Sequence, residues 1–144
     1  MENKDTLDEV NKGCTMGMDA LSFVLDKVED DDFKEVLSSF HSKYENLHKD
    51  VEAIYSNYTK KDEDPTETNV VNKAMTWSAV EMKTLTDTSN SKIAEILLQG
   101  TNMGIIEGRK LLNHKPDLDK DVEKILNEYV NMQEEEVETL KKYL

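Results

Sequence analysis

Gly100-Thr101-Asn102-Met103-Gly104-Ile105-Ile106-Glu107-Gly108 places three of the chain's five glycines four residues apart. The apolar residues on either side continue the same helical spacing, which predicts one helix with glycines along its inward face. Gly13 and Gly17 repeat this spacing near the N-terminus. Because a glycine inside a helix costs about 1 kcal/mol relative to alanine, we expect these glycines to serve a specific contact.

The expected contact is a close approach of helices at Gly13, Gly17, Gly100, Gly104 and Gly108. Interiors are close-packed, so a stripe of glycine leaves room that a neighbouring backbone or a bulky side chain such as Trp77 must fill. The partner is expected to be the other glycine-containing helix or the same helix of a second subunit. Both alternatives remain open at this point.

Working outward from this segment, apolar residues recur every three or four positions along most of the chain, which indicates an all-α protein. Thr6 with Glu9 and Asp32 with Glu35 have the spacing of capping boxes, so the first two helices are expected to begin there. Asp64-Pro65 opens a third helix, with proline at its first position. The expected helices span residues 6–28, 33–58, 65–85, 92–113 and 118–140.

The connections between these helices predict their arrangement. Short turns near residues 29–32 and 114–117 indicate two antiparallel hairpins. The third helix is about 30 Å long at 1.5 Å per residue, enough to return the chain from one end of a bundle to the other. We therefore predict a single domain, residues 1–144, with a ferritin-like antiparallel four-helix bundle and a helical crossover, five helices in all.

Composition and charge limit the classes of partner. The formal net charge is −13, which disfavours nucleic acid and anionic membranes as partners because both attract basic surfaces. Cys14 is the single cysteine, so no intramolecular disulfide forms and a reducing compartment is expected. The chain has no signal-peptide pattern at its start and no apolar run of about 18 residues. These features predict a cytoplasmic protein.

Two segments carry candidate metal ligands. Glu45-Asn46-Leu47-His48 places a carboxylate and an imidazole on one helical face, where both can reach a metal ion. Glu134-Glu135-Glu136 crosses the apolar stripe of the last helix, so at least one of its carboxylates is expected to face inward. Glu45, His48 and Glu136 are therefore the candidate ligands. The competing interpretation is a solvated, charged flank, because such pairs arise by chance in charge-rich helices.

The opening Thr6-Leu7-Asp8-Glu9-Val10, the turn Lys27-Val28-Glu29-Asp30, the glycine-centred fourth helix and the final amphipathic helix together resemble small bacterial ferritin-like bundles of the domain-of-unknown-function type. The resemblance covers about residues 6–140. Metal-binding members of that superfamily carry a glutamate on the first helix of each hairpin and Glu-x-x-His on the second. Met18 and Thr101 stand where those glutamates would lie, and the last helix lacks the histidine, so the resemblance implies a degenerate site.

Three functions follow as expectations. The first is a non-catalytic ferritin-like bundle without a cofactor, which acts through a protein partner or through self-association as a homo-oligomer. The second is a di-metal carboxylate oxidase or metal-storage protein that binds iron. The third is a bundle that binds a small apolar ligand in space opened by the glycines. No phosphate-loop, dinucleotide or Ser/His/Asp pattern points to another class of enzyme.

Overall fold

The computed structural model describes residues 2–59, 85–114 and 117–144. Within these residues the chain forms four long helices and one 3₁₀ turn, which are α1 (Glu2–Leu25), α2 (Asp31–Tyr55), η1 (Ser56–Tyr58), α5 (Asn90–Asn113) and α6 (Lys120–Lys141). The all-helical prediction is confirmed for this part of the chain. Of the helix expected at residues 65–85, residues 65–84, with Trp77 and the helical crossover, lie outside the described residues.

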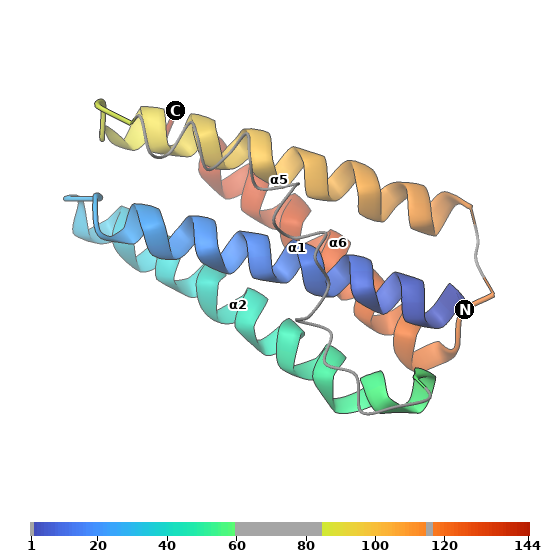
Figure 1. The fold of residues 1–144 in the computed structure, drawn as a ribbon. Coiled ribbons are helices and arrows are strands. Elements are labelled where there is room, and N and C mark those ends of the chain that lie inside the picture. Colours follow the sequence, from blue (N-terminus) through green and yellow to red (C-terminus); the bar gives the residue numbers. More distant parts are fainter. Residues whose placement is uncertain (1, 60–84, 115–116) are drawn as a thin grey trace.

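The four helices pack as two hairpins, α1 with α2 and α5 with α6 (Figure 1). In addition, α1 packs against both α5 and α6, and α2 packs against α6. Asn90 at the start of α5 donates a hydrogen bond to Asp30 at the start of α2, at 2.8 Å. The Tyr58 hydroxyl, just after α2, lies within hydrogen-bond distance of Asp119 and Asp121 at the start of α6, at 2.9 and 2.8 Å. Consequently α2 and α5 run in the same direction.

The observed helix starts differ from the expected ones, and both differences have a local cause. The N-cap of α2 is Asp30, not Asp32: its Oδ1 accepts from the backbone N–H of Asp32 at 2.9 Å and of Phe33 at 3.3 Å. Asp32 instead lies in the first turn, where a carboxylate complements the helix dipole. Thr6 does not cap α1, because that helix begins at Glu2 and Thr6 is buried inside it.

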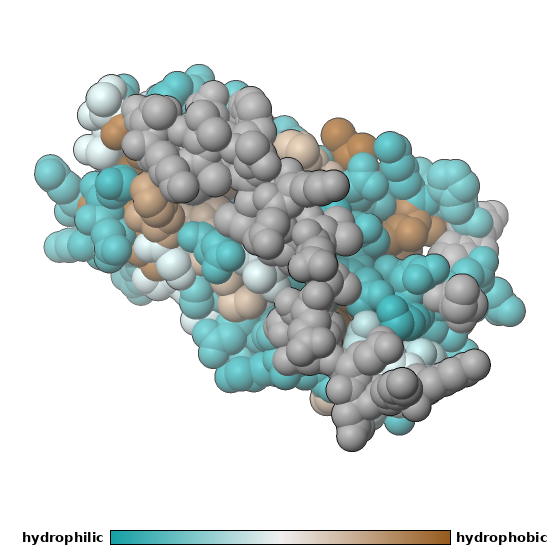
Figure 2. Space-filling view, in the orientation of Figure 1, coloured by the Kyte–Doolittle hydropathy of each residue, from teal (hydrophilic) through white to brown (hydrophobic). Residues whose placement is uncertain are grey.

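The predicted apolar stripes meet in one core. Burial of each large side chain stabilises the fold by about 1.5 to 3 kcal/mol, so the core is the main source of stability. All four helices contribute fully buried residues, among them Leu7, Val10, Leu21, Phe33, Leu37, Val51, Ile93, Ile96, Val122, Leu126 and Leu140. Hydrophilic side chains cover most of the coloured surface in Figure 2. No helix in the described ranges has the length and apolar character needed to span a membrane.

Four of the glycines make room for side chains of neighbouring helices. A Cβ atom at Gly17 would lie 2.8 Å from the ring of Tyr44 on α2, and one at Gly108 would lie 2.6 Å from Val130 Cγ2 on α6. Cβ atoms at Gly13 and Gly104 would overlap the Tyr129 hydroxyl and the Gln133 amide, both on α6. These closest neighbours are side chains, not the backbone of the other glycine-containing helix.

We predict that Gly108→Ala lowers the free energy of unfolding by about 1 kcal/mol. The added methyl group overpacks the stiff, β-branched Val130, which costs about 1 to 3 kcal/mol, and this outweighs the gain of about 1 kcal/mol in helix propensity. Denaturant melts measure the change. Asn102→Ala, an exposed position on the same helix, is the control and should be neutral or stabilising. Equal stabilisation of both variants would contradict the prediction.

Candidate functional site

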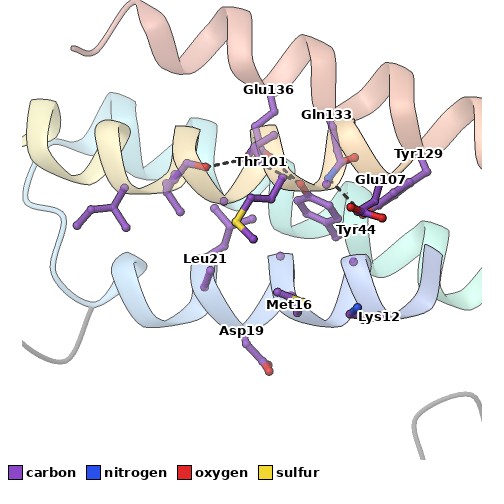
Figure 3. Close-up of a pocket in the computed structure, with 18 of the residues that line it drawn as sticks. Lys12, Met16, Asp19, Leu21, Tyr44, Thr101, Glu107, Tyr129, Gln133 and Glu136 are labelled. Atoms are coloured by element: carbon purple, nitrogen blue, oxygen red, sulfur yellow. Dashed lines mark hydrogen bonds between the residues drawn. The ribbon is translucent and has the colours of Figure 1, made fainter. Parts of the chain in front are cut away.

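A cavity of about 440 Å³ lies between α1 and α5 (Figure 3). Gly13 and Gly17 on α1 and Gly100 and Gly104 on α5 all line it. The remaining walls are largely apolar, formed by Met16, Ala20, Leu21, Phe23, Ile96, Leu97 and Met103. We call this space the α1/α5 cavity.

The inner wall of the cavity is polar, in contrast to its sides. We define the inner polar cluster as Tyr44 from α2, Thr101 from α5, and Tyr129, Gln133 and Glu136 from α6. All five residues are buried. The glycines bring the cluster to this position, because Tyr44 packs against Gly17, and Tyr129 and Gln133 occupy the space that side chains at positions 13 and 104 would fill.

Glu136 is the central residue of the cluster, and only 2% of it is exposed. Its carboxyl accepts from the Tyr44 hydroxyl at 3.0 Å and lies 2.9 Å from the Thr101 hydroxyl. Burial raises the pKa of Glu136 to about 7, although both hydroxyls and Lys43 favour the charged form. Near neutral pH this carboxyl is therefore divided between its acid and carboxylate forms.

The geometry around Thr101 agrees with a carboxyl that can hold a proton. The Thr101 Oγ1 atom is 2.8 Å from the carbonyl oxygen of Leu97, as well as 2.9 Å from Glu136 Oε1. A hydroxyl has one proton to donate. When Thr101 donates it to Leu97, a hydrogen bond with Glu136 requires the proton of the neutral carboxylic acid.

Gln133 supplies an unused acceptor beside Glu136. Its Nε2 donates to the Tyr129 hydroxyl at 3.3 Å, whereas its Oε1 has no hydrogen-bond partner within the described residues. A buried polar atom without a partner costs about 1 to 3 kcal/mol. Burial raises the pKa values of Tyr44 and Tyr129, so both remain neutral hydroxyls. Gln133, which lines the cavity, thus keeps an unused acceptor among its buried atoms.

Charged residues surround the outer part of the cavity. Glu9, Lys12, Asp19 and Glu107 line it and are at least partly exposed; we call these four residues the rim. Lys12 lies 4.0 Å from Glu9, so its charge is already paired. Glu107 likewise lies 3.7 Å from Lys110, so the net negative charge of the rim comes from Asp19.

The candidate metal ligands have separate partners. Glu45 pairs with Lys49 at 3.2 Å and lies 3.9 Å from His41. The ring nitrogens of His48 bond to Asn11 at 2.5 Å and to Glu52 at 2.6 Å.

Glu136 is the inward-facing carboxylate of its glutamate run, and it belongs to the inner polar cluster. In the parts of the chain that the structure describes, no three His, Cys, Asp or Glu side chains form a group that could hold a metal ion. The donor set of a di-iron centre is therefore not assembled by these residues.

Ser22 and His41 are also in contact: the Ser22 Oγ atom lies 3.1 Å from His41 Nε2. The other ring nitrogen of His41 is 3.9 Å from Glu45, which is too long for a hydrogen bond. Ser22 lies within α1, where backbone N–H groups are used by the helix and offer no oxyanion hole. This group lacks two parts of a nucleophilic catalytic site.

Sequence reasoning missed the inner polar cluster as a unit. Tyr44, Tyr129 and Gln133 lie among the apolar residues that recur along their helices, so the pattern marks them only as inward-facing. The sequence does show residues with a polar end at inward-facing positions on two helices. It does not show which residues those polar groups contact. No protein-family model matches the chain, and neither a curated protein nor a solved structure matches it. The ferritin-like resemblance thus stays a prediction.

We predict that Glu136 makes the protein less stable as pH rises. The folded-state pKa of about 7 exceeds the ordinary value of 4.5, so the folded state binds the proton more tightly. This contribution is complete below about pH 4.5 and is lost as pH rises through 7. The expected loss is on the order of 3 kcal/mol.

Denaturant melts of the wild type and of Glu136→Gln at pH 5, 6.5 and 8 test this prediction. The free energy of unfolding should fall with pH less steeply in Glu136→Gln than in the wild type. Glu138→Gln removes an exposed carboxylate from the same helix and should keep the wild-type slope, so it controls for the change in net charge. Equal slopes in all three proteins would contradict the assignment.

Proposed function

We propose that this chain is a non-catalytic helical bundle that binds a small, largely apolar molecule in the α1/α5 cavity. The observation that supports this proposal is the combination of an apolar-walled space of about 440 Å³ with a buried, unpartnered acceptor on its inner wall. Small-molecule sites usually have volumes of about 300 to 1,000 Å³ and a few polar groups that orient the ligand. The cavity has both properties.

The cost of the cavity also supports a binding role. Gly13, Gly17, Gly100 and Gly104 line it, and each glycine costs about 1 kcal/mol of helix stability relative to alanine. The unpartnered Oε1 of Gln133 adds the cost of a buried acceptor without a donor. A bound molecule that donates a hydrogen bond to this atom would offset the second cost.

The other expected functions stay predictions. A ferritin-like bundle acting through a protein partner or a second copy of itself is tested by gel filtration, which measures the oligomeric state. Iron binding is tested by metal analysis of the purified protein. The described residues give no assembled ligand set for iron, so we derive no chemistry through a metal.

We predict that N-phenyl-1-naphthylamine, an apolar fluorescent amine, binds with a stoichiometry of one per chain. Ala20 lines the cavity and is partly buried, so Ala20→Phe should fill the space and weaken binding at least tenfold, equivalent to about 1.4 kcal/mol. Fluorescence titration measures both properties.

The control is Ala53→Phe, which adds the same side chain at an exposed position of α2 outside the cavity lining. Circular dichroism verifies that both variants keep their helix content. Binding that is absent from the wild type, or weakened equally by the two substitutions, would overturn the proposed function.

A further inference from the structure

We propose that the ligand of the α1/α5 cavity is a cationic amphiphile, an ammonium group attached to an apolar body, with the ammonium bound by Glu136 and Gln133. This inference rests on the proposed function and specifies the class of ligand. It follows from what the inner polar cluster offers, from the charge around it and from the character of the walls.

The inner polar cluster contains acceptors that are not fully used. The Tyr44 hydroxyl donates to Glu136, the Thr101 hydroxyl lies 2.9 Å from Glu136, and Gln133 Nε2 donates one N–H to the Tyr129 hydroxyl. Gln133 Oε1 remains without a partner in the described residues, and the two Glu136 oxygens together have about four lone-pair sites. An ammonium group has three N–H donors and no acceptor, so it complements this wall.

The charges near the cavity favour a cation over an anion. No ion pair joins Glu136 to a basic side chain within the described residues, and Lys43 of α2 acts on it only from a distance, since its Nζ lies 3.8 Å from Glu135. From α1, the nearest charged groups of the cavity are Glu9 and Lys12 of the rim, which neutralise each other. A ligand carboxylate would be repelled by Glu136 at the inner wall and by Asp19 at the rim.

The residues of the cavity walls indicate the chemical character of the group that carries the ammonium. Met16, Leu21 and Phe23 face the space from α1, and Ile96, Leu97 and Met103 face it from α5. Such walls bind alkyl or aryl groups and cannot replace the hydration of a second charge. A polyamine, which is charged along its whole length, therefore does not fit, whereas an alkylammonium does.

The test compares three ligands with the same apolar body and different heads: octylammonium, octanol and octanoate. Isothermal titration calorimetry at pH 8 measures their affinities for the wild-type protein. An alkylammonium has a pKa near 10, like lysine, and stays charged at this pH. We expect octylammonium to bind at least tenfold more tightly than octanol, and octanoate to bind most weakly.

Two substitutions locate the head group. Glu136→Gln keeps the shape and removes the charge, so it should abolish the preference for octylammonium over octanol. Gln133→Met removes the unpartnered acceptor and should weaken octylammonium binding several-fold. Glu138→Gln, the exposed control on the same helix, should retain the full preference.

A pH series on the wild type gives a measurement that needs no variant. Glu136 must be ionised to pair with the ammonium, and burial holds its pKa at about 7. Octylammonium should therefore bind about tenfold more tightly at pH 8 than at pH 6, as the ionised fraction of Glu136 rises, with release of a proton below pH 7. Octanol binding should change little.

The outcomes separate this inference from the proposed function. If octanol or octanoate binds as tightly as octylammonium, or if Glu136→Gln keeps the ammonium preference, the inference is overturned and the cavity still binds small molecules. If N-phenyl-1-naphthylamine binds but none of the octyl compounds does, the inference also fails. If neither the dye nor any octyl compound binds, the proposed function itself is wrong.

Discussion

The hydrogen bonds of one buried carboxyl connect the two hairpins of the bundle. Glu136 on α6 bonds to Tyr44 on α2 and lies within hydrogen-bond distance of Thr101 on α5, partners that are 92 and 35 residues away along the chain. Burying an ionisable group is costly unless its partners are in place. The helices α2, α5 and α6 must therefore be rotated so that Glu136 keeps its hydrogen-bond partners. The same rotation determines which side chains face the α1/α5 cavity.

The glycines allow this arrangement. Gly17 admits the Tyr44 ring, and Gly13 and Gly104 admit the polar ends of Tyr129 and Gln133. A methyl group at any of these positions would require the neighbouring side chain to move. The glycine stripes thus have two linked effects: polar side chains from α2 and α6 reach the space between α1 and α5, and part of that space stays open.

The function proposed for the α1/α5 cavity is binding. Its inner wall contains a carboxyl with a raised pKa and an amide oxygen without a partner in the described residues, and the phenols beside them remain neutral. Cys14, the one thiol, is buried, and burial raises its pKa. Apolar walls with acceptors at one end suit a molecule that is itself apolar with donors at one end.

The sequence by itself determined the helices, because burial repeats every three to four residues and capping residues mark the ends within a few positions. It also indicated that the glycines inside the helices contact a neighbouring backbone or a bulky side chain. Only the tertiary structure decided that Tyr44, Gln133 and Glu136 meet at one wall, and that Asp30 caps α2. Periodicity places a residue on a face of its own helix, but it does not specify how helices from different hairpins are rotated and spaced. Hydrogen bonds between residues far apart in the chain depend on that geometry, so the site could not be predicted from the pattern alone.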